Sequence, residues 1–179
     1  TVLNEKEVGW IYQWCFDFQG QVIIGRKPTE LVEEWKKIYD ALELSEKKIL
    51  VCYAHNLSYD IVYLLQFLIE VFGQPKVLAL KPHKILSVKF TGIEFRCTYI
   101  LSNMSLDVWS KKVDSPIRKL VGAVDYNIVR FQDSELTDID WSYMVQDVLC
   151  LKESLKKEMI LSNDTIATIP ITSTGFVRR

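Results

Sequence analysis

Two short stretches of the sequence carry side chains that could do chemistry. The first, residues 54–60, reads AHNLSYD and follows the apolar run KKILVCY, so His55, Asn56 and Asp60 come directly after a predicted strand. Asn and Ser are also ordinary turn residues, and the helix dipole stabilises an Asp in the first turn of a helix. The stretch therefore has a structural and a catalytic interpretation, and the rest of the chain must decide between them.

The second stretch, DWSYMVQDVLCL, belongs to a predicted helix near the C-terminus. Tyr143 and Asp147 are four residues apart, which places them on one face of that helix. Asp147 stands between Met144 and Val148, close to the apolar stripe, where an unpaired carboxylate is costly. Because no Lys or Arg occurs within four residues of Asp147, we expect a metal ion as its partner.

Two aspartates on two helices, with a tyrosine beside one of them, suit metal-assisted hydrolysis of a phosphodiester. Hard divalent cations prefer oxygen ligands and accept substrate phosphates in their coordination shell. Two such ions activate a water molecule and stabilise the leaving oxygen, while a tyrosine hydroxyl can orient that water. The pattern predicts a site for hard divalent cations that includes Asp60 and Asp147.

The elements expected around these residues place Asp60 at one edge of a sheet. Hydrophobic periodicity and turn residues predict, in order, a hairpin over 8–25 turning at Gln19-Gly20, a helix over 29–42 capped by Thr29, a buried strand over 47–54 and a helix over 58–72. A hairpin turning at Thr91-Gly92, short helices over 105–113 and from Pro116, and a long helix begun by Thr137 and Asp140 follow. We expect a mixed α/β sheet with one parallel strand, whose carboxyl end leads to Asp60.

Length and composition fit one intracellular globular domain. The chain has 179 residues, a net charge of −1 and a pI near 6.1, which disfavours a dedicated duplex-binding protein but not an enzyme holding a few nucleotides. The four cysteines are far apart in apolar surroundings, so we expect reduced cysteines, neither a disulfide framework nor a zinc site, and a cytoplasmic location. The longest apolar run is too short to span a bilayer, and we expect no signal peptide.

Taken together, the motifs resemble those of the 3′–5′ exonuclease domain of family B DNA polymerases, most closely the protein-primed polymerases of phages and linear plasmids. HNLSYD resembles the family's second exonuclease motif, Asn-x-x-Phe/Tyr-Asp, and YMVQD resembles the third, Tyr-x-x-x-Asp. Ser105-Leu106-Asp107-Val108-Trp109 resembles a Ser/Thr-Leu motif that contacts single-stranded DNA, and the basic pair Arg118-Lys119 follows it as in the family. GAVDYN at 122–127 and ITSTGF at 171–176 resemble two further segments, and the second of these leads toward the polymerase portion.

The resemblance implies a ribonuclease-H-like α/β fold, a mixed sheet flanked by helices. It also implies two-metal-ion excision of single-stranded DNA from its 3′ end with Mg²⁺ or Mn²⁺. The roles that it implies are metal ligation for Asp60 and Asp147, water positioning for Tyr143, and contacts to the DNA strand for Asn56, Tyr59, Ser105, Leu106 and Lys119, with Tyr59 stacking on a base. Residues 1–163 would form the exonuclease domain, and 164–179 would be an extended segment leading toward the polymerase portion. The implied partners are a DNA 3′ end, the remainder of a polymerase chain and a terminal protein primer, with no membrane.

One departure from the family leaves alternatives open. The family's first motif, Asp-x-Glu, supplies two more ligands from an opening strand, and nothing before Val8 matches it; Asp17-Phe18-Gln19 lies at the hairpin turn and has Gln where Glu is required. We expect the chain to begin just after that motif and to bind metal weakly. The alternatives are a catalytically dead nucleic-acid-binding or interaction module of the same fold, and a separate RNA-processing exonuclease.

Each candidate residue also keeps a purely structural interpretation. These are a first-turn carboxylate for Asp60, a turn residue for Asn56, a packing residue for Tyr143, a helix N-cap for Ser105 and a solvated face for Arg118 and Lys119. His55 is interpreted as a hydrogen-bonded wall residue and is not assigned to metal.

Overall fold

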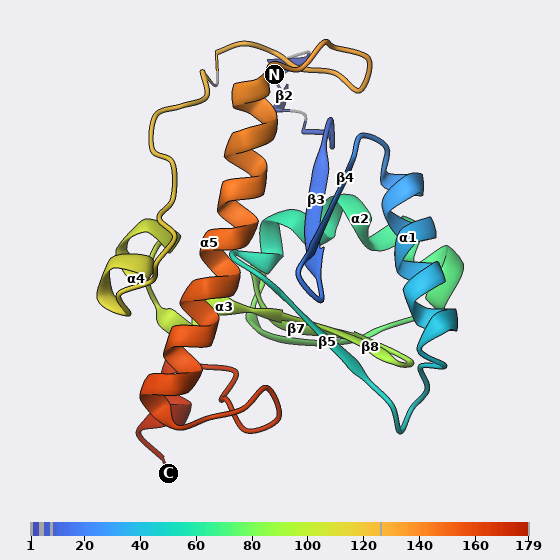
Figure 1. The fold of residues 1–179 in the computed structure, drawn as a ribbon. Coiled ribbons are helices and arrows are strands. Elements are labelled where there is room, and N and C mark those ends of the chain that lie inside the picture. Colours follow the sequence, from blue (N-terminus) through green and yellow to red (C-terminus); the bar gives the residue numbers. More distant parts are fainter. Residues whose placement is uncertain (1, 4–5, 8, 126, 179) are drawn as a thin grey trace.

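The computed structural model describes residues 2–3, 6–7, 9–125 and 127–178. The helices are α1 Pro28–Ala41, α2 Leu57–Phe72, α3 Thr98–Ser102, α4 Leu106–Lys112, α5 Asp138–Ser162 and the 3₁₀ helix η1 Ser173–Phe176. The strands are β1 Val2–Leu3, β2 Lys6–Glu7, β3 Trp14–Phe18, β4 Gln21–Gly25, β5 Leu50–Ala54, β6 Lys76–Lys81, β7 Lys84–Phe90 and β8 Ile93–Cys97. In Figure 1, α1 and α5 stand on opposite sides of the β3–β4 hairpin, and the longer sheet lies beneath it. The predicted mixed α/β architecture is confirmed.

The strands form three separate sheets in the described part of the chain. β1 pairs with β2 and β3 with β4, while the third sheet has four strands in the order β5-β8-β7-β6. β5 runs parallel to β8, and the other pairs in that sheet are antiparallel. The single parallel strand was predicted correctly, but β5 lies at an edge and is half-buried rather than fully covered.

The first hairpin forms because its two turn residues accept the left-handed conformation. Gln19 has φ 52° and Gly20 has φ 89°, and two positive φ angles match the right-handed twist of paired strands. The Asp17 carboxylate also accepts a hydrogen bond from the Gly20 N–H at 3.2 Å. The hairpin turns where predicted, but its first described strand begins only at Trp14, and Val8 lies outside the described residues.

Two expected helix starts were wrong. α1 begins at Pro28 after Lys27, not after Thr29, and the Glu30 carboxylate accepts hydrogen bonds from the N–H groups of Arg26 and Lys27 at 3.2 and 3.1 Å. No helix begins at Pro116, because the Ser115 hydroxyl bonds both backbone groups of Ile117 and so competes with helical pairing.

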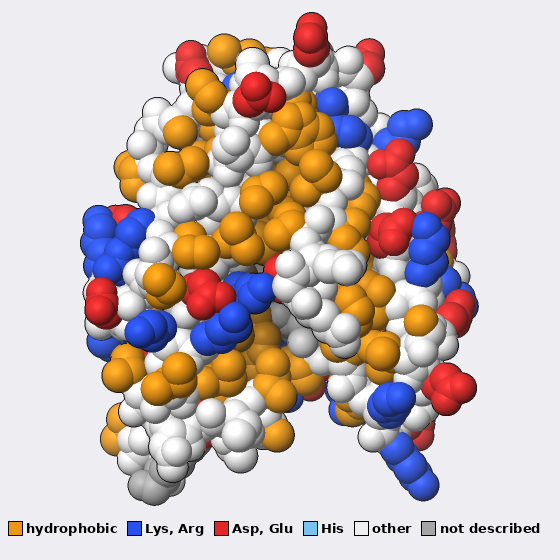
Figure 2. All heavy atoms as spheres, in the orientation of Figure 1, with side chains coloured by type: hydrophobic (Ala, Val, Ile, Leu, Met, Phe, Trp, Pro, Cys, Tyr) orange, Lys and Arg blue, Asp and Glu red, His pale blue; other side chains and the backbone are white. Residues whose placement is uncertain are grey.

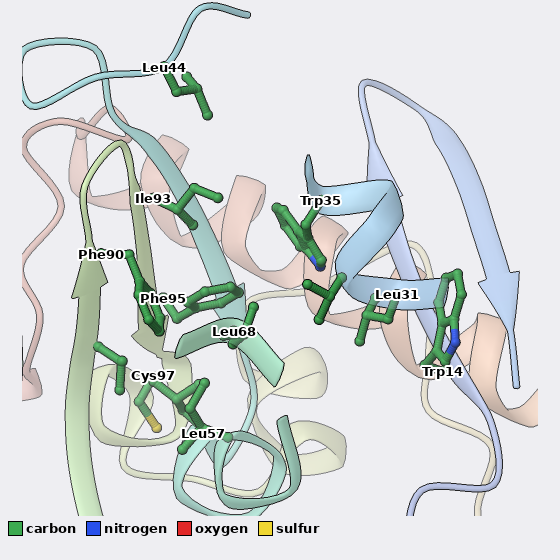
Figure 3. Close-up of a cluster of buried hydrophobic side chains, with 13 residues drawn as sticks. Trp14, Leu31, Trp35, Leu44, Leu57, Leu68, Phe90, Ile93, Phe95 and Cys97 are labelled. Atoms are coloured by element: carbon green, nitrogen blue, oxygen red, sulfur yellow. The ribbon is translucent and has the colours of Figure 1, made fainter. Parts of the chain in front are cut away.

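The larger core joins the first hairpin, α1 and α2 to one face of the four-stranded sheet. Figure 3 shows Trp14 and Leu31 at one end of this cluster and Phe90 and Phe95 at the other, with Trp35 between them. The Trp35 and Phe95 rings meet edge to face, with centroids 5.5 Å apart. Aromatic pairs of this kind contribute about 0.5–1.5 kcal/mol beyond their buried area. The edge-to-face contact between Trp35 of α1 and Phe95 of β8 therefore adds to the stabilisation that burial gives at this interface.

A second core lies between α3, α4 and α5. Trp109 is fully buried in it, and its indole N–H donates to Glu158 Oε2 at 2.8 Å. Ile169 is also buried there, and Phe176 packs against the same cluster. The chain after residue 163 was expected to be extended, but this burial folds it into turns and the helix η1.

Two further expectations concern cysteines and membranes. Cys97 and Cys150 are buried, Cys15 and Cys52 are half-buried, and all four are free thiols, as predicted. None of the described helices combines the length and the apolar character needed to cross a bilayer.

Candidate active site

The AHNLSYD stretch forms the junction between β5 and α2. Asn56 precedes the first helical residue and has φ 65° and ψ 49°, a left-handed conformation that Asn tolerates better than most residues. Its side chain makes no capping hydrogen bond and is exposed. Tyr59 and Asp60 follow in the first turn of α2, at the carboxyl end of the parallel strand as predicted.

Asp60 is a carboxylate with a perturbed pKa. Solvent reaches the residue, yet the protein atoms around it desolvate the carboxylate and raise its pKa to about 6. No Lys or Arg of the described ranges forms an ion pair with it. Such a carboxylate gains from any cation that reaches it.

Asp147 has a cationic partner in the structure, and that partner is Lys119. The Lys119 Nζ donates to Asp147 Oδ2 at 2.5 Å, and the two side chains are only 26% and 28% exposed. The second oxygen, Oδ1, is buried and has no hydrogen-bond partner within the described part of the chain. Burial raises the pKa of Asp147, and Lys119 opposes that rise. We expected a metal because no Lys or Arg lies near Asp147 in the sequence. This reasoning was wrong, because the fold brings in a cationic partner, Lys119, from 28 residues away.

Tyr143 meets the same lysine. The Lys119 Nζ lies 5.0 Å from the centroid of the Tyr143 ring, within the range of a cation–π interaction. Tyr143 and Asp147 therefore share one face of α5, as their spacing predicted, and a lysine lies against that face.

His55 is a neutral wall residue beside this group. Its Nδ1 lies 3.0 Å from Thr98 Oγ1, and its ring stacks on Trp109 at 6.2 Å and meets Tyr99 edge-on at 5.7 Å. Burial, and secondly the charge of Lys119, lowers the pKa of His55 to about 4. The structural interpretation of His55 is confirmed, whereas its aromatic neighbours were missed because no short motif links them to it.

The other predicted contact residues lie in different surroundings. Tyr59 is exposed, and its ring meets Tyr63 edge-on at 5.6 Å, so it presents an accessible aromatic surface. Ser105 is the N-cap of α4 and accepts a hydrogen bond from the Val108 N–H at 3.4 Å, which confirms its structural interpretation. Leu106 is buried in the second core, which leaves little of it to touch a DNA strand. The DNA contacts of these residues stay predictions.

The carboxylates are not gathered into one complete metal centre. Within the described ranges, no three His, Cys, Asp or Glu residues are placed to hold one ion. The buried and unpartnered Asp147 Oδ1 does fit an oxygen-coordinated cation. These residues therefore offer part of a ligand set, and the two-ion site stays a prediction.

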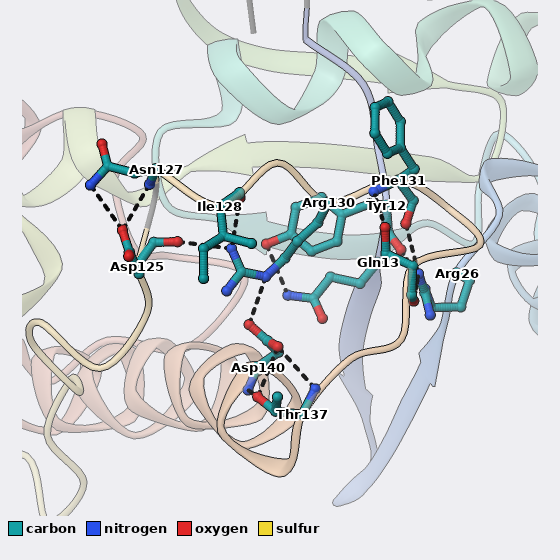
Figure 4. Close-up of polar contacts among 11 residues, drawn as sticks. Tyr12, Gln13, Arg26, Asp125, Asn127, Ile128, Arg130, Phe131, Thr137 and Asp140 are labelled. Atoms are coloured by element: carbon teal, nitrogen blue, oxygen red, sulfur yellow. Dashed lines mark hydrogen bonds and ion pairs between the residues drawn. The ribbon is translucent and has the colours of Figure 1, made fainter.

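A polar network holds residues 125–134, which follow Lys119 in the connection to α5, and Figure 4 shows it between the start of α5 and the first hairpin. Arg130 Nε lies 2.9 Å from Asp140 Oδ1, and these side chains are only 11% and 4% exposed. Arg26 donates to the carbonyls of Phe131 and Ser134 at 2.8 and 2.9 Å. Nothing in the local sequence predicted this network, because its partners are separated by up to 120 residues.

Trp10 adds to the same network. Its indole N–H donates to the Arg130 carbonyl at 2.7 Å, and its ring stacks on Phe131 with centroids 4.9 Å apart. In the Gly-x-x-Asp-Tyr-like segment, Asp125 accepts hydrogen bonds from Asn127, whereas Tyr126 lies outside the described residues.

The face of the molecule in front of α5 is largely apolar at its centre. Figure 2 shows apolar side chains in a band down the middle of this face, with most charged side chains at its two margins. Below the middle the surface is hollowed, and Lys and Arg side chains lie beside the hollow.

Comparison with known proteins gives similarity in fold alone. No family model and no curated protein matches the sequence. The chain is similar to phi29 DNA polymerase complexed with primer-template DNA and incoming nucleotides, with a TM-score of 0.66 and 13% identity over 87% of this chain and 27% of that one. It is also similar to phi29 DNA polymerase complexed with single-stranded DNA, with a TM-score of 0.63 and 12% identity over 87% of this chain and 28% of that one. This chain thus spans about a quarter of the length of those polymerase chains.

Proposed function

We propose that this chain is a 3′–5′ exonuclease domain of a family B DNA polymerase and has a ribonuclease-H-like fold. It would remove nucleotides from the 3′ end of single-stranded DNA with the help of Mg²⁺ or Mn²⁺. The observation that carries the proposal is the group formed by Asp147, Tyr143 and Lys119, in which one buried carboxylate oxygen has no partner in the described structure. Its setting, a fold similar to part of a DNA polymerase, supports the same function.

The roles of the residues follow from their chemistry. Asp60 and Asp147 would hold the ions through carboxylate oxygens, which hard cations prefer. Bound ions would supply activation of the water and stabilisation of the leaving oxygen. The Tyr143 hydroxyl would accept or donate a hydrogen bond that orients the water. Lys119 would exchange its bond to Asp147 for one to the scissile phosphate, which also carries negative charge.

The 3′-terminal nucleotide would bind at the start of α2. Tyr59 is exposed there and can stack on a base, which is worth about 1–3 kcal/mol per base. The Asn56 side chain is exposed, makes no capping bond and lies three residues away, so its amide is free to bond a base or sugar. Both residues precede Asp60, which would place the terminal phosphodiester between them and the ions.

The remaining carboxylates would come from a further strand. The outer edge of β5 has no strand partner in the described part of the chain, and its register with β8 is regular. It contains no Lys, Pro or bulge, the features that usually protect an edge from pairing. A strand bearing Asp-x-Glu could pair there, and the end of β5 leads within a few residues to Asp60.

One observation favours a second function, a non-catalytic module that binds single-stranded DNA. Lys119 already neutralises Asp147, and no three-residue metal-ligating group occurs in the described ranges. Such a module would bind DNA in a salt-sensitive way, because phosphate contacts release counterions, and would not cleave it.

Two experiments separate these functions. The first is to read the gene upstream of the codon for Thr1: an in-frame Asp-x-Glu within about fifteen codons would supply the missing carboxylates.

The second is to follow excision of 5′-labelled single-stranded DNA by the protein with that segment included, with Mn²⁺ and with EDTA. We expect metal-dependent excision that Asp60→Asn and Asp147→Asn each abolish, and that Asp138→Asn, an exposed carboxylate in the first turn of α5, leaves unchanged. Normal excision by both site variants would disprove the assignment, and DNA binding without cleavage would establish the module.

A further inference from the structure

β6 is an apolar strand that adds nothing to either core. All six of its residues are exposed, and Val77, Leu78 and Leu80 are 52%, 51% and 64% accessible. Its partner β7, by contrast, contributes Val88 and Phe90 to the larger cluster. The run Val-Leu-Ala-Leu is therefore not explained by the folding of this chain, because burial of these side chains does not occur.

The outer edge of β6 is open for pairing. It is the last strand of its sheet, and no backbone group of another described residue bonds to it beyond its ladder with β7. Natural edge strands usually carry a charge or a proline in their middle to prevent pairing. In β6 the charges, Lys76 and Lys81, stand only at the two ends. The register with β7 shifts on both sides of Ala79, and such an irregularity limits regular pairing, so a strand added here would be short.

The hairpin around β6 is strongly basic. Residues 71–93 contain four lysines and no Asp or Glu, whereas the whole chain has a net charge of −1. None of these lysines forms an ion pair with a described residue. The lysines are Lys76, Lys81, Lys84 and Lys89. The edge therefore favours a partner that carries negative charge.

We propose that β6 is a docking strand for an extended, acidic and aliphatic segment of a partner protein, which adds to the sheet as a fifth strand. Main-chain hydrogen bonds would give the affinity of such strand addition, and the side chains would give its selectivity. Because successive residues of a strand point to opposite faces, aliphatic side chains on one face of the segment would contact either Val77 or Leu78 but not both, and the flanking lysines would pair with the acidic side chains. This inference does not depend on the proposed exonuclease function.

Single-stranded DNA and a second copy of the chain fit this edge less well. Sequence-independent binding of single strands relies on aromatic side chains, but β6 has none, and Phe90 beside it is buried. Antiparallel pairing of two β6 strands would place Lys76 of one copy opposite Lys81 of the other. Like charges directly opposite each other destabilise a strand pair.

The test is an NMR titration of the 179-residue protein labelled with ¹⁵N. The probe is a capped six-residue peptide of alternating Glu and Val. A matched probe has the same sequence with alternate backbone nitrogens methylated, which keeps the charge but removes the donors that strand pairing needs. Leu80→Lys places a charge in the middle of the edge, and Val62→Lys makes the same kind of change at an exposed position of α2.

We expect shifts confined to residues 76–90, at least tenfold weaker binding of the methylated peptide, and a similar loss in Leu80→Lys but not in Val62→Lys. Loss in Leu80→Lys despite its extra positive charge would separate strand pairing from simple charge attraction. Equal binding of both peptides would overturn the proposal in favour of charge attraction. Tighter binding of a short oligothymidylate at the same residues, concentration-dependent shifts without peptide, or no shift at millimolar peptide would each overturn it as well.

Discussion

Replacing Lys119 by Met should make the protein bind Mn²⁺ more tightly. The change removes the ammonium that bonds Asp147 Oδ2 at 2.5 Å and keeps a side chain of similar length. In the native chain an ion can take that oxygen only by displacing Lys119, while Oδ1 already has no partner within the described structure. In Lys119→Met both oxygens are open to the ion.

The size of the effect follows from the burial of the pair. The two side chains are 26% and 28% exposed, so solvent screens their bond only in part. A hydrogen bond to a charged group contributes about 1.5–3 kcal/mol net, and every 1.4 kcal/mol corresponds to about a tenfold change in affinity. Losing the competing bond should therefore raise Mn²⁺ affinity by roughly 10- to 100-fold.

The assay is Mn²⁺ binding by the decrease of the free-ion EPR signal, measured at pH 8. Alkaline conditions matter because burial raises the pKa of Asp147 and Lys119 opposes the rise, so without Lys119 the carboxylate is protonated more readily at low pH. Lys152→Met is the matched control. Lys152 lies on α5, the helix that carries Asp147, and pairs with Asp17 at 2.7 Å, and its side chain is about as exposed as that of Lys119. Unchanged affinity in Lys119→Met, with binding still lost in Asp147→Asn, would refute the competition; no effect of Asp147→Asn would refute the ion site itself.

Two further predictions concern stability. Asp140→Ala should lower the free energy of unfolding in urea by about 3–5 kcal/mol, because it removes the carboxylate that pairs with the largely buried Arg130 guanidinium and also the hydrogen bonds that Asp140 accepts from Thr137 at the start of α5. Asp138→Ala, on the exposed side of the same turn, should cost less than about 1 kcal/mol, and equal losses would contradict the role of Asp140. The folded-state pKa of Asp60 is raised to about 6, so the folded protein holds a proton that the unfolded chain releases above about pH 4. The free energy of unfolding should therefore fall as pH rises from about 4 to about 6. The urea midpoint of Asp60→Asn should lack this decrease, and an identical pH profile in both proteins would show that Asp60 is not the group responsible.

The parts of the fold that were predictable from sequence are those decided by neighbours in the chain. The turn at Gln19-Gly20 needs only two residues that accept positive φ. The start of α5 depends on Thr137 and Asp140, whose side chains bond each other's backbone N–H groups. Tyr143 and Asp147 share one face of α5 because of their helical spacing, and Lys119, from the connection between α4 and α5, contacts both of them there.

The parts that sequence could not give depend on partners far away in the chain. Lys119 and Asp147 are 28 residues apart, and a search of the four neighbouring positions misses such a pair. The position of β5 at a sheet edge was hidden because its apolar run is typical of a covered strand. The helix expected at Pro116 failed through a single competing hydroxyl, that of Ser115. In the first two cases a tertiary arrangement overrides a local preference, whereas the contact between Ser115 and Ile117 is local and joins residues only two positions apart.

The connection between α4 and α5 is fastened to α5 at two places. Lys119 pairs with Asp147 toward the middle of α5. Further along the connection, Arg130 pairs with Asp140 at the start of the same helix. The connection therefore runs antiparallel to α5, as Figure 1 shows at the left of that helix.

The two ion pairs differ in burial, and we expect this difference to set the order in which they open. The Arg130 pair is the more deeply buried, while the Lys119 pair is reached by solvent. Local opening should thus begin at the Lys119 end and stop at Arg130, so that the face of Tyr143 can be uncovered as a small independent opening unit, without unfolding of the helix beneath it. The free energy needed to expose the site would then be that of releasing the roughly ten residues between Lys119 and Arg130, and not that of unfolding the domain.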